Sequence, residues 1–419
     1  MSKKLAVIAL SKNLLTGQIT STRWEELLNL ALLDLSFNSL EGSIPVSLFY
    51  HPSLEQLLLS KNQFSGQLDE FSNVSSHILS VLDLSSNNLE GAIPMSMFDF
   101  QDSPLPNLSN LFVVDLRSNQ LQGPLPILKP NVNFVDFSWN NFSSNIPVNI
   151  GNWLPNTIFF SLASNRFQGS IPESICNAAP LEVLDLSNNS FSGTIPRCLT
   201  SMNLGVLDLK RNSLTGTIPD TFSEQCALHT LDVNGNLLDG KLPESLASCT
   251  QLELQTDLLE ASNKNRFVWK AMMDDKKEVH SKLGHLQFSS LDRSVYYLNT
   301  IRVTYKGLEK ELVKILTIFT SLDFSCNNFD VPIPVELEEL RLLYVLNLSH
   351  NAFTGHIPSS VGKLSHLELL DLSSNELAGE IPLQLADGLI FLSVLNLSFN
   401  QLVGQIPSIK QFPTFSEMS

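Results

Sequence analysis

Several residue types and motifs are scarce in this chain of 419 residues, and each scarcity excludes a class of protein. Five cysteines are too few for a small domain held together by disulfides. Lysine and arginine number 26 against 42 acidic residues, and the net charge of −16 argues against nucleic acid or an anionic membrane as the main partner. Glycine-rich phosphate loops, Cys-x-x-Cys and His-Glu-x-x-His are missing, and the eight histidines are scattered. No cofactor or metal is therefore expected.

Long apolar runs are missing as well. The chain starts with Met1-Ser2 and two lysines, followed by Leu5–Leu10, a hydrophobic stretch shorter than that of a secretory signal. The most apolar window, residues 312–324, contains Lys314 and is too short to cross a membrane. The sequence thus predicts neither a signal peptide nor a membrane span within this chain.

The most abundant pattern is an asparagine in the frame Leu-x-Leu-Ser-x-Asn-x-Leu-x-Gly. Most intervals are about 24 residues, within the leucine-rich-repeat range. Since one repeat cannot bury its own leucines, stacked repeats must form the core. We predict an α/β leucine-rich-repeat solenoid, a right-handed superhelix with a parallel sheet on its concave face. The asparagines are Asn13, Asn38, Asn62, Asn87, Asn119, Asn140, Asn165, Asn189, Asn212, Asn236, Asn327, Asn351, Asn375 and Asn400.

Each repeat asparagine is expected to have a structural role. In the repeat around Asn38, Leu33 and Leu35 alternate with outward residues, the period of a half-buried strand. An amide side chain carries both donors and acceptors, so Asn38 can satisfy backbone groups where the chain leaves the strand. Each such bond contributes about 1 kcal/mol.

An aspartate recurs at the outward middle position of many strands. Paired carboxylates can serve acid–base catalysis, but a catalytic site is asymmetric, whereas these residues form a ladder. We therefore expect a structural ladder and no enzyme activity, and the repeat itself accounts for part of the acidity. The aspartates are Asp34, Asp83, Asp115, Asp136, Asp185, Asp208, Asp232, Asp323 and Asp371.

Four cysteines are spaced by one repeat. Cys176 and Cys198 are 22 residues apart, and Cys226 and Cys249 are 23 apart. Adjacent coils stack at about 4.8 Å, within the Cα separation that a disulfide tolerates. Two disulfides and two pairs of buried free thiols both fit this spacing, and Cys326 has no counterpart.

The second half of the repeat reads Gly-x-Ile-Pro, as at Gly42–Pro45 and Gly379–Pro382. Glycine permits a tight turn, and proline suits a lateral edge strand. The whole frame resembles the plant-specific class of leucine-rich repeat, found in plant extracellular receptors and in polygalacturonase-inhibiting proteins. Thr20, Asp69 and Ser144 depart from this pattern.

The repeat pattern stops for roughly 90 residues after Asn236. We therefore predict three parts: repeats over 1–252 (about ten), an irregular island over 253–318, and four repeats within 319–419. Within the island, Thr300–Tyr305 alternates like a strand, and Leu308–Ile318 reads as a helix.

An island before the last four repeats resembles the plant receptor-like proteins. Tyr297, eight intervening residues and then Lys306-Gly307 match a motif of that family's island, and Val303–Asn328 is similar to its junction with the repeats. Trp269–Met273 resembles the approach to the island. The family's signal peptide, cysteine caps and C-terminal membrane helix are not recognised here, so the chain is expected to be truncated at both ends.

The resemblance implies a cell-surface ectodomain on the extracellular side of the plasma membrane, attached only through a C-terminal helix missing from this chain. The island and the concave face before it would receive a protein, peptide or microbial ligand, with Tyr297, Lys306 and Gly307 carried over from the motif. The last repeats would face a co-receptor kinase.

Outward residues of unusual type are the other candidates for binding, since exposed aromatics and arginine are enriched at interaction hot spots. Phe37 is one of them. The ligand-binding candidates are Trp139, Phe159, Arg211 and His229, and the co-receptor-facing candidates are Tyr344, His350 and Phe399. Single exposed aromatics are also ordinary surface features.

Six Asn-x-Ser/Thr sequons permit glycosylation of a secreted chain. They begin at Asn73, Asn107, Asn141, Asn188, Asn347 and Asn396.

The leading functional hypothesis is a non-enzymatic ligand-binding ectodomain, acting in plant defence or development through co-receptor kinases. The alternatives are a soluble inhibitor of cell-wall-degrading enzymes such as polygalacturonase, which an inhibition assay would identify, and a nonfunctional truncated remnant.

Overall fold

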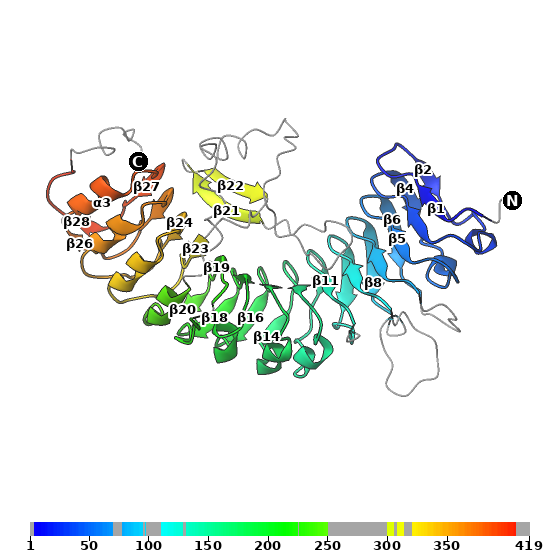
Figure 1. Cartoon of the computed structure of the whole chain (residues 1–419), viewed down its shortest axis with the longest axis horizontal. Helices are drawn as coiled ribbons and strands as arrows, with labels where there is room; N and C mark the ends of the chain where they lie inside the picture. Colours follow the sequence, from blue (N-terminus) through cyan, green and yellow to red (C-terminus); the bar gives the residue numbers. More distant parts are fainter. Residues whose placement is uncertain are drawn as a thin grey trace. The chain divides into compact units, whose positions relative to one another are not determined.

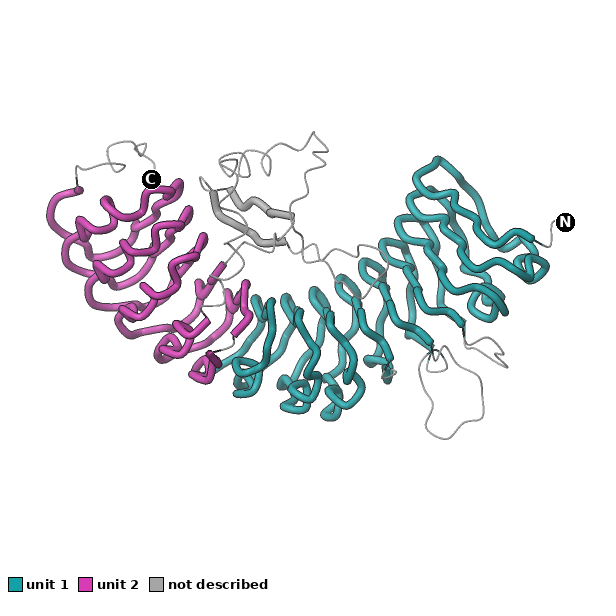
Figure 2. The backbone as a smooth tube through the Cα atoms, viewed as in Figure 1, with its two compact units in different colours: residues 1–216 teal, residues 217–419 magenta. Residues whose placement is uncertain are grey.

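The computed structural model describes residues 4–69, 78–94, 97, 110–128, 131–224, 226–249 and 321–407, with the backbone of Thr300–Tyr305 and Leu308–Val313. The chain forms two compact units, Met1–Gly216 (unit 1) and Thr217–Ser419 (unit 2) (Figure 2). Each unit is a stack of short coils with a parallel sheet along one side (Figure 1). This is the predicted leucine-rich-repeat solenoid. Across the described residues, no helix has the length and apolarity needed to cross a bilayer.

The main sheet of unit 1 is built from one three-residue strand per coil. Neighbouring strands pair in parallel and in register, so that Leu33 of one coil lies between Ile8 and Leu57 of its neighbours. The described strands are β1 (Val7–Ala9), β3 (Leu32–Asp34), β5 (Gln56–Leu58), β7 (Val81–Asp83), β9 (Val113–Asp115), β11 (Phe134–Asp136), β13 (Phe159–Ser161), β15 (Val183–Asp185) and β17 (Val206–Asp208).

A second row of strands follows the repeat asparagines of unit 1. The strands β2 (Thr16–Gln18), β4 (Ser39–Gly42), β6 (Gln63–Gln67), β8 (Asn88–Ala92), β10 (Gln120–Gly123) and β12 (Asn141–Phe142) form one lateral sheet. Further along the chain come β14 (Gln168–Ser170), β16 (Ser190–Gly193) and β18 (Ser213–Gly216).

Short 3-10 helices return the chain to the next main strand. In unit 1 they are η1 (Trp24–Glu26), η2 (Val46–Leu48), η3 (Ile150–Trp153), η4 (Glu173–Asn177) and η5 (Arg197–Thr200). The repeat prolines were expected within lateral strands, but Pro45, Pro172 and Pro196 precede η2, η4 and η5 directly. The start of a helix suits proline because the first N–H groups have no partner within the helix.

Unit 2 repeats this plan. Its main strands are β19 (Thr230–Asp232), β23 (Ser321–Asp323), β24 (Val345–Asn347), β25 (Leu369–Asp371) and β27 (Val394–Asn396), and its other elements are β20 (Leu237–Leu238), β26 (Ala378–Gly379), β28 (Gln401–Leu402), η6 (Glu244–Ser248), η9 (Val335–Glu339), η10 (Ser359–Lys363) and the α-helix α3 (Leu383–Gly388). Strand β19 pairs directly with β23, with Thr230 beside Ser321. The long segment between these strands therefore leaves no gap in the sheet.

Two strands belong to the segment predicted as an island. β21 (Thr300–Tyr305) pairs antiparallel with β22 (Leu308–Val313), so the helix expected over Leu308–Ile318 is wrong for its first six residues. Only Lys306 and Gly307 separate the two strands in sequence. A two-residue link containing glycine favours a hairpin, whose ladder satisfies the backbone groups of both strands.

The core of each unit is a continuous column of leucines and phenylalanines. Leu33, Leu57 and Leu82 are fully buried on successive strands. Beside the lateral strands, the rings of Phe142 and Phe167 stack 5.9 Å apart, centroid to centroid, and one coil contacts the next through these rings. Since every coil buries apolar surface only against its neighbours, stability depends on stacking.

The repeat asparagines bind the backbone as predicted. The Asn87 Nδ2 donates to the carbonyls of Leu84 and Ser85 in its own coil and to Leu59 in the preceding coil, at 3.0, 3.2 and 3.1 Å. Its Oδ1 accepts the N–H of Phe64 at 3.0 Å. One side chain thus satisfies four backbone groups and joins two coils.

Candidate functional site

The mid-strand aspartates hold the chain where each strand ends. The Asp34 Oδ1 accepts the N–H and the hydroxyl of Ser36, at 3.0 and 2.6 Å. Asn347 and Asn396 stand at this position in unit 2 and accept the same two bonds from Ser349 and Ser398. Since a neutral amide replaces the carboxylate without changing these bonds, the ladder has a local structural role.

Two groups of these aspartates are buried in unit 1. Arg117 lies between Asp115 and Asp136, with Nε–Oδ2 and Nη1–Oδ2 distances of 3.4 and 3.5 Å. Burial raises the pKa of both carboxyls, and Arg117 opposes the rise. Burial also raises the pKa of Asp185 to about 7; Asp208 adds to this effect and Lys210 opposes it.

Of these aspartates, Asp185 can hold a proton near neutral pH. The Lys210 Nζ lies 2.7 Å from the Asp208 Oδ2, so that ammonium group already has a partner. Within the described ranges, no group of three or more His, Cys, Asp or Glu side chains could hold a metal ion.

A row of left-handed residues runs along the edge of each main sheet. The residue directly before the repeat asparagine has a φ between 50° and 56° in coil after coil. A left-handed conformation costs a residue with a Cβ about 1–2 kcal/mol, so the stacked coils must impose it. We call this feature the left-handed row; its members other than glycine are Lys12, Phe37, Lys61, Ser86, Ser118, Trp139, Ser164, Asn188 and Arg211 in unit 1, and Cys326, His350, Ser374 and Phe399 in unit 2.

Four predicted binding residues belong to this row. The side chains of Trp139 and Phe399 are 54% and 82% exposed, and Arg211 and His350 are exposed as well. The backbone N–H groups of Trp139 and His350 are used between coils, where they donate to the carbonyls of Ala163 and Ser373 at 2.8 and 2.9 Å. In these two residues the side chain is therefore the part left for a ligand.

Phe159 and His229 lie elsewhere, on main strand β13 and beside β19. The expectation that Phe159 is exposed is wrong, because its ring stacks on Phe134 with centroids 4.2 Å apart and only 1% of the residue is exposed. His229 is half-buried, and burial lowers its pKa. The alternation of residues within one strand shows that a side chain points away from the core, but it does not show whether a ring on the neighbouring strand covers that side chain.

Tyr344 is half-buried and lies outside the row, beside residues that the sequence did not single out. Its ring centroid lies 6.2 Å from that of His366, which lies 6.2 Å from that of Phe391. Burial raises the pKa of the neighbouring Glu368 to about 7. Spacing of about one repeat places these rings on successive coils and could have indicated them.

Several predicted residues fall outside the described part of the chain: Tyr297, Lys306, Gly307, Asn73 and Asn107. The other sequons differ in their surroundings. Asn141 begins β12, and Asn188 is half-buried in the left-handed row.

The Asn347 Nδ2 already donates to Asp323 and Ser325, at 3.3 and 3.1 Å. The Asn396 Nδ2 donates to Asp371 at 3.2 Å. A glycan at either residue would have to displace these bonds.

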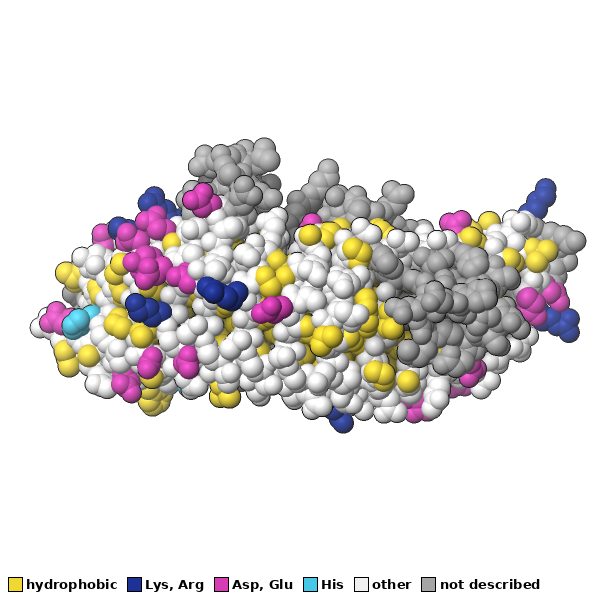
Figure 3. Space-filling view, turned by 90° about the horizontal axis from the view of Figure 1, so that it is seen from below, with side chains coloured by type: hydrophobic (Ala, Val, Ile, Leu, Met, Phe, Trp, Pro, Cys, Tyr) yellow, Lys and Arg dark blue, Asp and Glu magenta, His cyan; other side chains and the backbone are white. Residues whose placement is uncertain are grey.

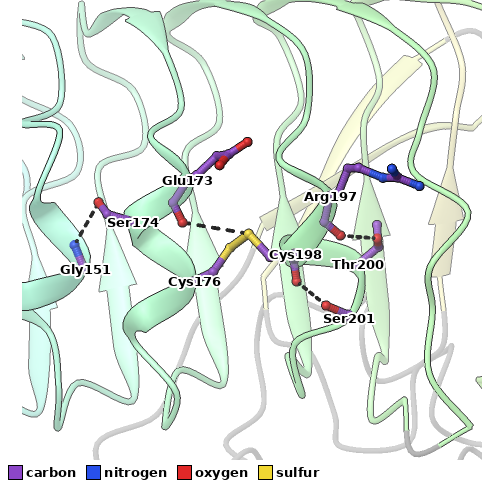
Figure 4. The surroundings of a disulfide bond; sticks show 8 residues. All are labelled: Gly151, Glu173, Ser174, Cys176, Arg197, Cys198, Thr200 and Ser201. Carbon is purple, nitrogen blue, oxygen red and sulfur yellow. Dashed lines mark hydrogen bonds between the residues drawn. A yellow bond between two sulfur atoms is a disulfide. The ribbon is translucent and has the colours of Figure 1, made fainter.

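The four spaced cysteines form two disulfides. Cys176 at the end of η4 is joined to Cys198 in η5, with Cα atoms 6.0 Å apart (Figure 4). Cys226 is joined to Cys249, with Cα atoms 4.6 Å apart. Both bonds tie the helix side of adjacent coils, away from the main strands. They therefore stiffen the stack without occupying the left-handed row.

Figure 3 shows one face of the molecule, on which acidic side chains gather at one end among a few basic and apolar ones. The exposed aromatic members of the left-handed row are Phe37, Trp139 and Phe399.

Comparisons with known proteins place these features in a family context. The leucine-rich-repeat model matches residues 29–50, 79–100, 180–202, 203–224, 227–249, 342–364, 366–387 and 391–411. The chain is similar to receptor-like proteins 35 and 53 of Arabidopsis thaliana, at 30% and 31% identity over 220 and 231 residues. These alignments cover 41% and 42% of this chain and 23% of each relative, so the similarity spans about a quarter of their length.

The solved structures include receptors with bound peptides. The Arabidopsis receptor kinase HAESA, solved with the peptide hormone IDA and the co-receptor SERK1, is 28% identical with a TM-score of 0.67, over 97% of this chain and 59% of that one. The plant peptide hormone receptor RGFR1, solved with RGF2, has the same TM-score at 24% identity, over 97% and 57% of the two chains, and shows a shared fold.

Proposed function

Because the chain belongs to the plant leucine-rich-repeat receptor-like proteins, we propose that it is a non-enzymatic, ligand-binding ectodomain segment of a cell-surface receptor. It would bind a peptide or a microbial product outside the plasma membrane. It would signal in defence or development by bringing co-receptor kinases together.

The observation that best supports this proposal is the left-handed row. In unit 1 it carries an exposed indole at Trp139 and an exposed guanidinium at Arg211. The coil preorganises the backbone of both residues before a ligand arrives, so binding need not order it. Aromatic and arginine side chains are also the types that dominate binding free energy at protein interfaces.

Exposed and half-buried aromatic residues of unit 2 support a second proposed contact, with a co-receptor. Phe399 and His350 extend from the row, and Tyr344 lies beside His366 and Phe391 on neighbouring coils. HAESA was solved with both a peptide and a co-receptor, and we extend that arrangement to this chain as a proposal. The co-receptor would contact these residues of unit 2.

The test is association of the purified chain with a co-receptor ectodomain of the SERK1 kind, across a panel of candidate peptides and microbial extracts. We expect one member of the panel to promote association. Phe399→Ala should weaken that association about tenfold or more, as at interface hot spots. Leu383→Ala, which alters an exposed residue of α3 outside the row, is the control and should have little effect. Failure of every candidate to promote association would remove the support for this function.

A further inference from the structure

Lys12, Phe37 and Lys61 occupy the same place in the left-handed row on three successive coils of unit 1. The Lys12 N–H donates to the Ser36 carbonyl at 3.0 Å, and the Phe37 N–H donates to the Ser60 carbonyl at 2.8 Å. The Nζ atoms of Lys12 and Lys61 lie 5.7 and 4.4 Å from the centroid of the Phe37 ring. An exposed ring thus positions two ammonium groups at the edge of the sheet.

These two lysines belong to an acidic chain with a net charge of −16. Arg117, Lys210 and Lys363 form ion pairs with carboxylates. Neither Lys12 nor Lys61 forms an ion pair with any described residue, and both are exposed. Within the described part of the chain, their charge-related contact is the Phe37 ring, so an anionic group from another molecule can approach both.

The sheet face next to these lysines is open. Val7 of β1 is 56% exposed, and the outward residues Leu32 of β3 and Leu58 of β5 are half-buried. On β9 to β17 the outward residues are buried. The Asp34 carboxylate on the open face bonds to Ser36 in its own coil. This part of the sheet can therefore accept apolar side chains.

We propose that Lys12, Phe37 and Lys61 form a docking site for an acidic peptide segment. Its carboxylates would contact the two ammonium groups, and its apolar side chains would lie on β1, β3 and β5. An extended peptide fits because its side chains alternate in direction, so acidic and apolar residues can face different parts of the site. An acidic sugar fits less well, since the ammonium groups occupy the ring faces on which it would stack. The inference rests on the proposed function and adds the chemistry of the ligand.

The experiment uses the full chain and a fluorescent peptide of repeated Glu-Val-Glu-Ser units, with a Gln-Val-Gln-Ser peptide as its neutral counterpart. We expect the acidic peptide alone to bind, more weakly as salt is added. Lys12→Gln with Lys61→Gln should weaken binding at least about tenfold and reduce its salt dependence. Phe37→Ala should weaken it about threefold, while Phe37→Tyr keeps the ring and should preserve it. The control pair Lys241→Gln with Lys363→Gln changes the net charge equally and should leave affinity unchanged.

Four outcomes would overturn the inference. The lysine double variant could bind the acidic peptide as tightly as the control pair does, or the native chain could bind the neutral peptide as tightly as the acidic one. The native chain could also bind an oligogalacturonate more tightly than the acidic peptide, or it could self-associate in a way that is lost when the two lysines are replaced. Peptide binding that survives the lysine changes but is lost in Trp139→Ala would reject this site and leave the receptor function intact. The proposed receptor function is tested separately, by measuring association of the chain with the co-receptor.

Discussion

At the scale of single residues, one side chain in each coil satisfies backbone groups that no regular ladder can reach. Asn87, for example, is buried and serves two coils at once. Asn13 is exposed and bonds only to the carbonyls of Leu10 and Ser11 in its own coil. The same residue type at the same place in the repeat should therefore differ in its contribution to stability.

Replacing Asn87 with alanine would remove four hydrogen bonds and leave the Phe64 N–H without its acceptor, whereas the carbonyls of Leu59, Leu84 and Ser85 keep Asn62, Asn119 and Lys61 as donors. A buried unpaired group costs about 1–3 kcal/mol and each lost bond about 1 kcal/mol, so we expect a loss of about 3 kcal/mol. Urea unfolding followed by circular dichroism measures it. Asn13→Ala is the matched control, with an expected loss below about 1 kcal/mol. Equal losses in the two variants would show that the asparagines do not join the coils.

Asp185 gives a pH-dependent prediction. Because burial raises its pKa to about 7, the folded chain keeps a proton between about pH 4 and pH 7 that the unfolded chain has released. The contribution of Asp185 to stability is thus greatest in acid and is lost as pH rises through 7. Asp185→Asn should be more stable than the native chain at pH 8, by about 1 kcal/mol or more, with the advantage vanishing toward pH 4.

Thermal melts at pH 4 and pH 8 test this expectation. Asn347 and Asn396 show that asparagine can make the same local bonds at this position, so the substitution should not disturb the strand end. Asp34→Asn, on the half-buried face of β3, is the matched control and should change the pH profile less. A lower stability of Asp185→Asn at pH 8 would contradict the account.

At the scale of elements, the coil is the unit that the sequence specifies best. The spacing of leucine and asparagine predicted the strand, the bend and their stacking because all three depend on residues within one repeat. The left-handed conformation of residues such as Trp139 was not predicted, since many residue types occupy that place and Gly235 is the only glycine among the described ones. Phe159 and the Leu308–Val313 strand were misjudged because their state depends on a neighbouring strand.

The disulfide between η4 and η5 adds a covalent tie between two coils. Replacing both Cys176 and Cys198 with serine should lower stability by about 3 kcal/mol, the value usual for a closed loop of this length. The loss should be local, so amide hydrogen exchange should rise first in residues 173–200. Reduction of the native chain with a thiol should reproduce the effect on these coils, whereas unchanged exchange there after either treatment would show that the tie adds no stability.

At the scale of the whole molecule, each unit combines a stack of coils with an edge of residues whose backbone is held in the left-handed conformation. The regular aspartates and asparagines maintain the coil, whereas the residue type in the left-handed row differs from one coil to the next. This division explains why the fold and the family follow from the sequence, whereas the ligand does not. In the proposed function, the ligand would be selected by a few side chains of the left-handed row, such as Trp139 and Arg211.

The most direct test of the central claim, that the left-handed row binds the ligand, is the affinity of the chain for a peptide that promotes co-receptor association. Isothermal titration calorimetry should show that Trp139→Ala and Arg211→Ala each weaken binding about tenfold or more. Val148→Ala, which alters a residue that is 84% exposed outside the row, should have no effect. Unchanged affinity in both row variants, or an equal loss in all three, would contradict the account.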